Sequence, residues 1–240
     1  MKSPIMRVVI GLLLLFSVAL IVTAQEELCF EKGGVWNADE SQCNIQFSVE
    51  IDIDYPLALA EHEFIGEAID LFLEWVRGNF MTFATDASGW SVPAPWTLAV
   101  DYEEFAFSDT IVSLKFTVYE YTGGAHGNTF FQTFVFDLDS EQGLILEDLF
   151  VEEFLPFEAI SPLVQADLME QLGEFADSQW IEDGTGVNPN NYLNFVVTGE
   201  SLLFFFPPYQ VAPYAAGPLT VGIPLAELDA ILVPPFAMGS

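Results

Sequence analysis

Basic residues are scarce in this chain of 240 residues, which has 5 Lys plus Arg against 36 Asp plus Glu. Two of the five, Lys2 and Arg7, lie in the first ten residues, and no acidic residue precedes Glu26. Without residues 1–24 the chain keeps 3 basic and 36 acidic side chains, a formal charge of −33. Such a chain cannot neutralise phosphates, so nucleic acid is excluded as a partner and an anionic lipid surface is disfavoured.

This acidity is not that of a disordered tail. Hydrophobic residues make up 52% of the chain, and 23 residues are Phe. Disordered acidic segments lack this apolar content. The composition therefore predicts a folded acidic protein with a large aromatic core.

Histidine and cysteine are also scarce, with two of each. A serine triad would have to use His62 or His126, and the sequence has no Gly-x-Ser-x-Gly turn. His62 has no second histidine four residues further on, so it does not form a helical zinc motif, and we expect it to be solvated. The sequence thus indicates no catalytic residue, no resident metal and no cofactor.

Residues 1–24 have the pattern of a secretory signal. Lys2 and Arg7 precede an apolar run from Val8 to Val22, and Val22 and Ala24 are small residues at a cleavage position. An uncleaved anchor is the alternative, but the run is shorter than the roughly 20 residues of a spanning helix. We expect cleavage before Gln25 and an extracytoplasmic location, either periplasmic or secreted. Membrane contact would then occur only through an uncleaved signal segment.

Export gives the two cysteines a role. Cys29 and Cys43 bound a Gly- and Asn-containing segment, and in an oxidising compartment they are expected to form one disulfide. A closed loop of about 15 residues contributes roughly 3 kcal/mol in the chain-entropy model. A two-cysteine metal site is the alternative, but neither histidine is near in sequence. We therefore predict a disulfide-closed segment at 25–45.

The rest of the chain alternates between strand and helix patterns. Strands are predicted at 47–55, 98–107, 111–121, 128–138, 144–146, 192–198, 201–206 and 219–223, helices at 59–80, 161–178 and 224–232, and loops at 88–96 and 184–191. Ser161 and Pro162 have the residue types of a helix start. We predict an α+β fold with a mainly antiparallel sheet, two amphipathic helices and a short C-terminal helix. A single domain is expected over 46–233, followed by a tail at 234–240.

Acidic residues alone identify no site. Paired carboxylates could serve a glycosidase, but 36 acids place some pairs close together in any fold. Residues 182–191 offer several oxygen ligands for calcium, yet they lack the spacing and closing glutamate of an EF-hand. An ordinary solvated loop is favoured there, and calcium remains an open alternative.

Two strings are distinctive. The first, YTGGAHGN at 121–128, places Tyr121, Gly123, Gly124 and His126 in a glycine-rich turn whose exposed backbone and imidazole could bind a ligand. The alternative is a tight strand connection in which the histidine bonds a carbonyl. The second, PPYQVAPYAAG at 207–217, carries two tyrosines in a proline-rich loop. That loop would form a rigid binding rim or simply pack over the sheet edge.

Together these strings resemble a known family. Residues 111–150, with the Tyr-x-Gly-Gly-Ala-His turn and a Leu-x-Asp-Leu-Phe close, are similar to the RsiV-type extracytoplasmic domain, as is the ending at 192–232. Residues 47–83 resemble its companion segment. The resemblance implies a binding module, because such domains form the sensing part of lysozyme-responsive anti-sigma factors and also precede the catalytic domain of PdaC-like peptidoglycan deacetylases. It does not by itself transfer sigma regulation or deacetylation.

From these patterns we expect an exported, non-catalytic binding module of the cell envelope. Its ligand would be a basic protein such as lysozyme, or a peptidoglycan fragment. The candidate contact residues are Tyr121, Gly123, Gly124, His126, Tyr209 and Tyr214. The alternative is a cell-wall polysaccharide hydrolase that uses paired carboxylates.

Overall fold

The computed structural model describes residues 25–29, 35–44, 48–86 and 95–237. The expected signal segment at 1–24 and most of the expected loop at 88–96 lie outside the described residues. Within the described part of the chain, no helix has both the length and the apolar character needed to cross a membrane.

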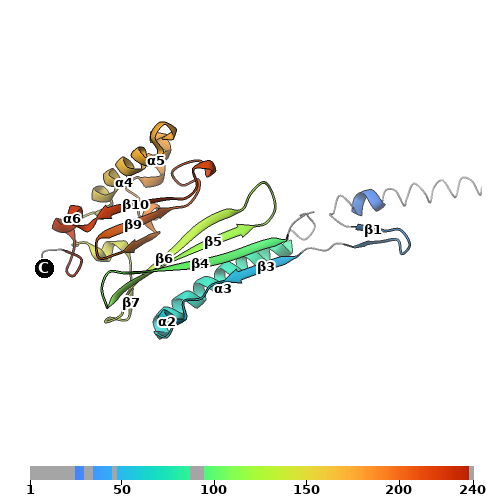
Figure 1. Cartoon of the computed structure of the whole chain (residues 1–240), viewed down its shortest axis with the longest axis horizontal. Helices are drawn as coiled ribbons and strands as arrows, with labels where there is room; N and C mark the ends of the chain where they lie inside the picture. Colours follow the sequence, from blue (N-terminus) through green and yellow to red (C-terminus); the bar gives the residue numbers. More distant parts are fainter. Residues whose placement is uncertain (1–24, 30–34, 45–47, 87–94, 238–240) are drawn as a thin grey trace, which may run out of the picture.

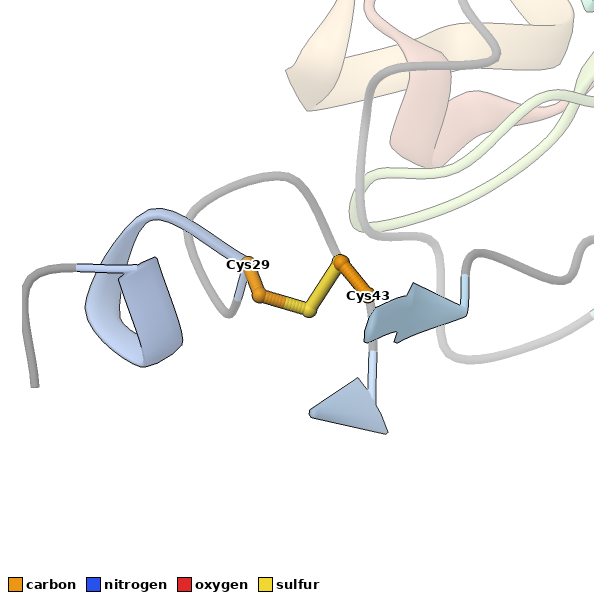
Figure 2. The surroundings of a disulfide bond; sticks show 2 residues. All are labelled: Cys29 and Cys43. Atoms are coloured by element: carbon orange, nitrogen blue, oxygen red, sulfur yellow. A yellow bond between two sulfur atoms is a disulfide. The ribbon is translucent and has the colours of Figure 1, made fainter. Parts of the chain in front are cut away.

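The amino-terminal segment is closed by the predicted disulfide. Residues 25–29 are helical, β1 (Val35–Asn37) pairs with β2 (Gln42–Asn44), and Cys29 is bonded to Cys43 with 5.6 Å between their Cα atoms. Figure 2 shows the bond joining the end of the helical turn to the hairpin. The cysteine prediction is confirmed, and the described chain has no free thiol.

A five-stranded sheet, here called the large sheet, forms one half of the fold. Its order is β3-β4-β5-β6-β7, and the strands are β3 (Val49–Ile53), β4 (Trp96–Ala106), β5 (Ile111–Tyr121), β6 (Asn128–Asp137) and β7 (Gln142–Leu144). The meander from β4 to β6 is antiparallel, as predicted, but β3 is parallel to β4. The chain between β3 and β4 runs through a long helix, and such a crossover returns the chain in the same direction.

That helix covers one face of the large sheet. A short α2 (Leu57–Ala60) leads into α3 (Glu63–Asp86), which lies along the sheet in Figure 1. Residues on one helical face and on alternate strand positions share a core that includes Ile65, Ile69, Phe72, Val76, Leu98, Leu114, Phe116 and Val118. The strand alternation and the helical spacing in the sequence are both satisfied by this one interface.

A three-stranded sheet, here called the small sheet, lies against the other face. Its order is β10-β9-β8, with β8 (Phe195–Val197), β9 (Ser201–Phe206) and β10 (Leu219–Pro224). Helices α4 (Pro156–Leu172), α5 (Ser178–Thr185) and α6 (Leu225–Leu228) accompany it (Figure 1). Short 3-10 turns lie at η1 (Leu146–Leu149), η2 (Gly173–Phe175), η3 (Pro189–Tyr192), η4 (Tyr214–Ala216) and η5 (Asp229–Ile231). The α+β prediction is confirmed.

Two hydroxyl side chains of the large sheet join it to the edge of the small sheet. The backbone N–H of Phe195 donates to Thr133 Oγ1 at 2.9 Å, and that hydroxyl donates to the carbonyl of Leu193 at 3.3 Å. Ser113 makes the same kind of pair with Val197, at 3.3 and 3.4 Å. A buried strand edge must find partners for its backbone groups, and these hydroxyls supply them.

A half-buried ammonium lies between the two sheets. Lys115 on β5 pairs with the Glu103 carboxylate, and its Nζ lies 4.6 Å from the ring centroid of Phe205 and 5.4 Å from that of Phe131. Its side chain is 12% exposed. Among the described residues the other Lys or Arg is Arg77 on α3. Because Lys115 is paired between the sheets, Arg77 is the remaining basic side chain, apart from histidine, that can offset the negative charge of the described surface.

One helix prediction needs correction, and one helix was not predicted. Helix α4 begins at Pro156, not at Ser161, which is buried within it and donates its hydroxyl proton to the Thr185 carbonyl at 2.6 Å. The polar stretch from Ser178 to Thr185 forms α5, a helix that the sequence pattern did not reveal. Asp177 begins it by accepting bonds from the N–H groups of the second and third helical residues, which is an ordinary N-cap.

Candidate functional site

The turn between β5 and β6 is held by its own residues. Gly123 and Gly124 have φ of 98° and 97°, a conformation that favours glycine. The hydroxyl of Tyr121 donates to the Gly124 carbonyl at 3.2 Å. Gly127 is buried against the ring of Tyr119, and a β-carbon there would force that ring to shift. Tyr121, Gly123 and Gly124 therefore shape the turn that carries His126.

The second distinctive loop, at 207–217, is a series of tight turns. Tyr209 has a φ of 73°, rare for a residue with a bulky side chain, and its N–H donates to the Ala212 carbonyl at 3.0 Å. The N–H of Gln210 donates to the Pro207 carbonyl at 3.2 Å. Backbone strain of this kind persists only where the surroundings enforce it.

Helix α5 and η3 hold the loop at 207–217 in this conformation through hydrogen bonds. The indole Nε1 of Trp180 donates to the Tyr209 carbonyl at 3.1 Å, and Gln210 Nε2 donates to the carbonyls of Gly184 at 3.0 Å and Asn191 at 2.9 Å. Gly184 is so close to the Gln210 carbonyl oxygen that a β-carbon would clash with it. The loop at 207–217 is thus anchored to the helix that the sequence pattern missed.

The two loops meet in an aromatic stack. The rings of His126 and Tyr214 lie 3.7 Å apart between centroids with 17° between their planes, and Tyr209 and Tyr214 lie 5.7 Å apart at 35°. We call His126, Tyr214 and Tyr209 the aromatic platform. His126 is exposed, Tyr214 is half-buried, and Tyr209 is 51% exposed. Three of the six predicted contact residues therefore lie together at the surface.

The imidazole of His126 has a defined donor. Its Nδ1 lies 2.8 Å from the Gly127 carbonyl, which only accepts, so Nδ1 carries the proton and donates. In neutral imidazole Nε2 is then an acceptor, and on protonation it becomes a second donor. The predicted alternative, a histidine that bonds a carbonyl, is present, and the same ring also stacks on Tyr214.

A cavity of about 590 Å³ lies beside the platform. Its lining residues are Asp177, Gln179, Trp180, Asp183, Gly184, Asn191 and Gln210. Both carboxylates already have partners, because Asp177 caps α5 and Asp183 accepts from Gln179 Nε2 at 2.9 Å. Trp180 was not among the residues predicted from the sequence; the signal that could have indicated it was Asp177, an N-cap residue ahead of a short polar helix.

The oxygen-rich segment at 182–191 has structural bonds of its own. Asn188 Oδ1 accepts from the N–H of Asn190 at 3.1 Å, and Asn191 Nδ2 donates to the carbonyls of Asp183 and Gly186 at 3.4 and 3.3 Å. Across the described residues, no three His, Cys, Asp or Glu side chains are grouped as metal ligands. His62 lies between α2 and α3, exposed and edge-on to Phe64, apart from the platform residues along the chain.

Two family models match the chain. Residues 44–129 match the model described as Deacetylase PdaC, and residues 147–226 match the model described as Protein of unknown function (DUF3298). His126 belongs to the first matched segment, whereas Tyr209 and Tyr214 belong to the second. The aromatic platform therefore forms where the two matched segments meet.

Three bacterial proteins are similar to this chain over most of its length. The immunogenic protein MPT64 of Mycobacterium tuberculosis is 26% identical over 97% of this chain and 100% of that protein. An esterase of M. tuberculosis H37Rv is 25% identical, covering 87% of this chain and 85% of the esterase. The peptidoglycan-N-acetylmuramic acid deacetylase PdaC of Bacillus subtilis is 26% identical over 75% of this chain, but over only 38% of the deacetylase.

A solved structure has a similar fold. A DUF3298 family protein from Pseudomonas aeruginosa PAO1 superposes with a TM-score of 0.58 at 17% identity, covering 87% of this chain and 93% of that one. This likeness concerns the fold alone. Over its two matched segments the chain is thus similar to PdaC-type and DUF3298 proteins.

Proposed function

We propose that this protein is an exported, non-catalytic binding module of the cell envelope, of the RsiV type, whose ligand is a basic protein or a wall fragment. The observation that carries the proposal is the stack of His126 on Tyr214, which joins two loops from separate matched segments into one exposed surface. Export is supported by the Cys29–Cys43 disulfide, since such bonds persist in oxidising compartments.

The chemistry of the platform suits a cationic group. Ring faces attract ammonium and guanidinium groups, and such contacts contribute about 0.5–2 kcal/mol according to how well they exclude water. The mature chain carries a formal charge of −33, and the described Lys115 is already paired within the fold. A basic partner would therefore be steered toward this surface and held by its side chains on the tyrosine rings.

Calorimetry with lysozyme and with soluble peptidoglycan fragments tests the proposal, at low salt and at about 0.5 M salt, where charges are screened within a few ångströms. The informative variant is Tyr209→Gly, because glycine accepts the φ of 73° while the ring is lost. We expect unchanged or higher stability with binding weakened roughly 2- to 30-fold.

A matched control is Phe83→Ala, which removes an aromatic ring that is 53% exposed and belongs to α3 instead of the platform loops. This variant should bind as the parent does. The proposal fails if neither lysozyme nor wall fragments bind, or if both variants bind as well as the parent.

The hydrolase alternative has two features in its favour. Asp177 and Asp183 line the same cavity, and two relatives are named as an esterase and a deacetylase. Incubation of the purified protein with peptidoglycan, followed by assay of released reducing ends and acetate, tests it. Turnover that Asp183→Asn abolishes would replace the binding proposal with an enzymatic one.

A further inference from the structure

A second surface, which contains none of the platform residues, is apolar although the chain is strongly acidic. A cavity of about 610 Å³ lies between β6, β7 and η3, and another of about 790 Å³ lies between η1, the start of α4 and the segment before η3. Both are lined by Glu147, Phe157 and Pro189, so they adjoin. We call the two cavities together the apolar groove.

Large apolar side chains stand exposed along this groove. They are Ile145 at 60% and Leu193 at 65% beside the first cavity, and Phe154 at 51%, Leu155 at 63% and Val187 at 60% beside the second. Single exposed apolar residues are ordinary, but five of them around adjoining hollows mark a binding surface.

The charges around the groove select its occupant. Glu147, Asp148 and Glu152 line the second cavity and are exposed, and neither Arg77 nor Lys115, the Lys and Arg of the described residues, lines either one. A second copy of this chain would bring the same negative charge, and an anionic membrane or a fatty acid would place anions beside these carboxylates. Each of these occupants is repelled.

We propose that the apolar groove binds a cationic amphipathic segment of a partner protein. Apolar side chains of one helical face would enter the two cavities, and lysines or arginines beside them would pair with Glu147 and Glu152. The inference goes beyond the proposed function, because it concerns a different surface and needs none of the platform residues.

The probe is a synthetic peptide of leucine and lysine, about 14 residues or roughly four helical turns long, with leucine at helical spacing. Its control has the same composition with leucine and lysine in alternating order. Binding to the purified protein is measured by fluorescence anisotropy at about 0.15 M salt, where general charge attraction is screened beyond about 8 Å. We expect the helical-pattern peptide to bind roughly tenfold more tightly than its control.

Variants locate the binding. Leu193→Lys removes an exposed apolar side chain of the groove and adds a positive charge, and it should weaken binding roughly tenfold. Leu57→Lys makes the same change at a residue on α2 that is 74% exposed, and should leave binding unchanged. Equal binding of the two peptides, equal effects of the two lysine variants, or loss of binding through Tyr209→Gly instead of Leu193→Lys would each overturn the proposal.

Discussion

The hydroxyl of Thr133 offers a sharp test of how the two sheets are held together. Thr133 is 7% exposed, accepts the N–H of Phe195 at 2.9 Å and donates to the Leu193 carbonyl at 3.3 Å. The variant Thr133→Val keeps the size and branching of the side chain and removes both hydrogen bonds. The Phe195 N–H then stays buried at the junction without a partner.

The cost follows from this orphaned donor. A buried polar group left without its partner costs about 1–3 kcal/mol, and the added methyl group of valine offsets up to about 0.8 kcal/mol through apolar burial. We therefore expect a net loss of about 1–2 kcal/mol. For a chain of this size each kcal/mol lowers Tm by about 2–4 °C, so Tm should fall by about 2–8 °C.

Urea unfolding and calorimetry measure this loss, with Thr117→Val as the matched control. Thr117 lies on the same strand as Ser113 and four residues along, so its side chain points to the same face, but it is half-buried. We expect the control to stay within about 0.5 kcal/mol of the parent. If Thr133→Val were as stable as the control, the hydroxyl would not be what joins the sheets.

Two further changes test the support of the platform and the acid response. Gly184→Ala should lower the free energy of unfolding by about 1–3 kcal/mol and weaken binding at the platform, because the new β-carbon would displace the Gln210 backbone. The control Gly78→Ala has open space around it on α3 and should raise the free energy of unfolding by about 0.5–1 kcal/mol. Urea unfolding would contradict this if both gained. The Ser140 hydroxyl, with the N–H groups of residues 139 and 140, lowers the pKa of the Asp137 carboxyl in the folded protein. The stability that these hydrogen bonds contribute is therefore present above the pKa that Asp137 has in the unfolded chain, and it is lost as the pH falls through its pKa in the folded protein. Ser140→Ala should raise that pKa in an NMR titration, and an unchanged pKa would refute the assignment.

Local patterns in the sequence were enough to predict several features of the fold and of the candidate site. Alternation and helical spacing predicted the antiparallel strands from β4 to β6, and β5 and β9 have the predicted bounds. Two cysteines in an export context predicted the disulfide, and the two distinctive strings identified the residues that form the platform. These features depend on neighbouring residues or on a residue count, so no tertiary information was needed.

Other local signals were overridden by contacts distant in sequence. Ser161 and Pro162 have the residue types of a helix start, but the hydroxyl of Ser161 bonds the Thr185 carbonyl, and α4 begins at Pro156. Helix α5 is short and polar, and it is bonded to the loop at 207–217. Gln210 donates to a carbonyl of the helix, and Trp180 of the helix donates to a carbonyl of the loop. Its stability comes from tertiary bonds, which no helical pattern in the sequence records.

The sequence by itself determined the acidity, the aromatic core, the closed amino-terminal segment and the two unusual loops. Only the tertiary structure decided that the loops meet, because the ring of His126 reaches Tyr214 through the pairing of β5 with β6 and the anchoring of residues 207–217 to α5. It also decided that Lys115 pairs with Glu103 and lies over the Phe205 ring between the sheets. Charge and periodicity are properties of the chain, whereas a site made from distant segments exists only where packing brings them together.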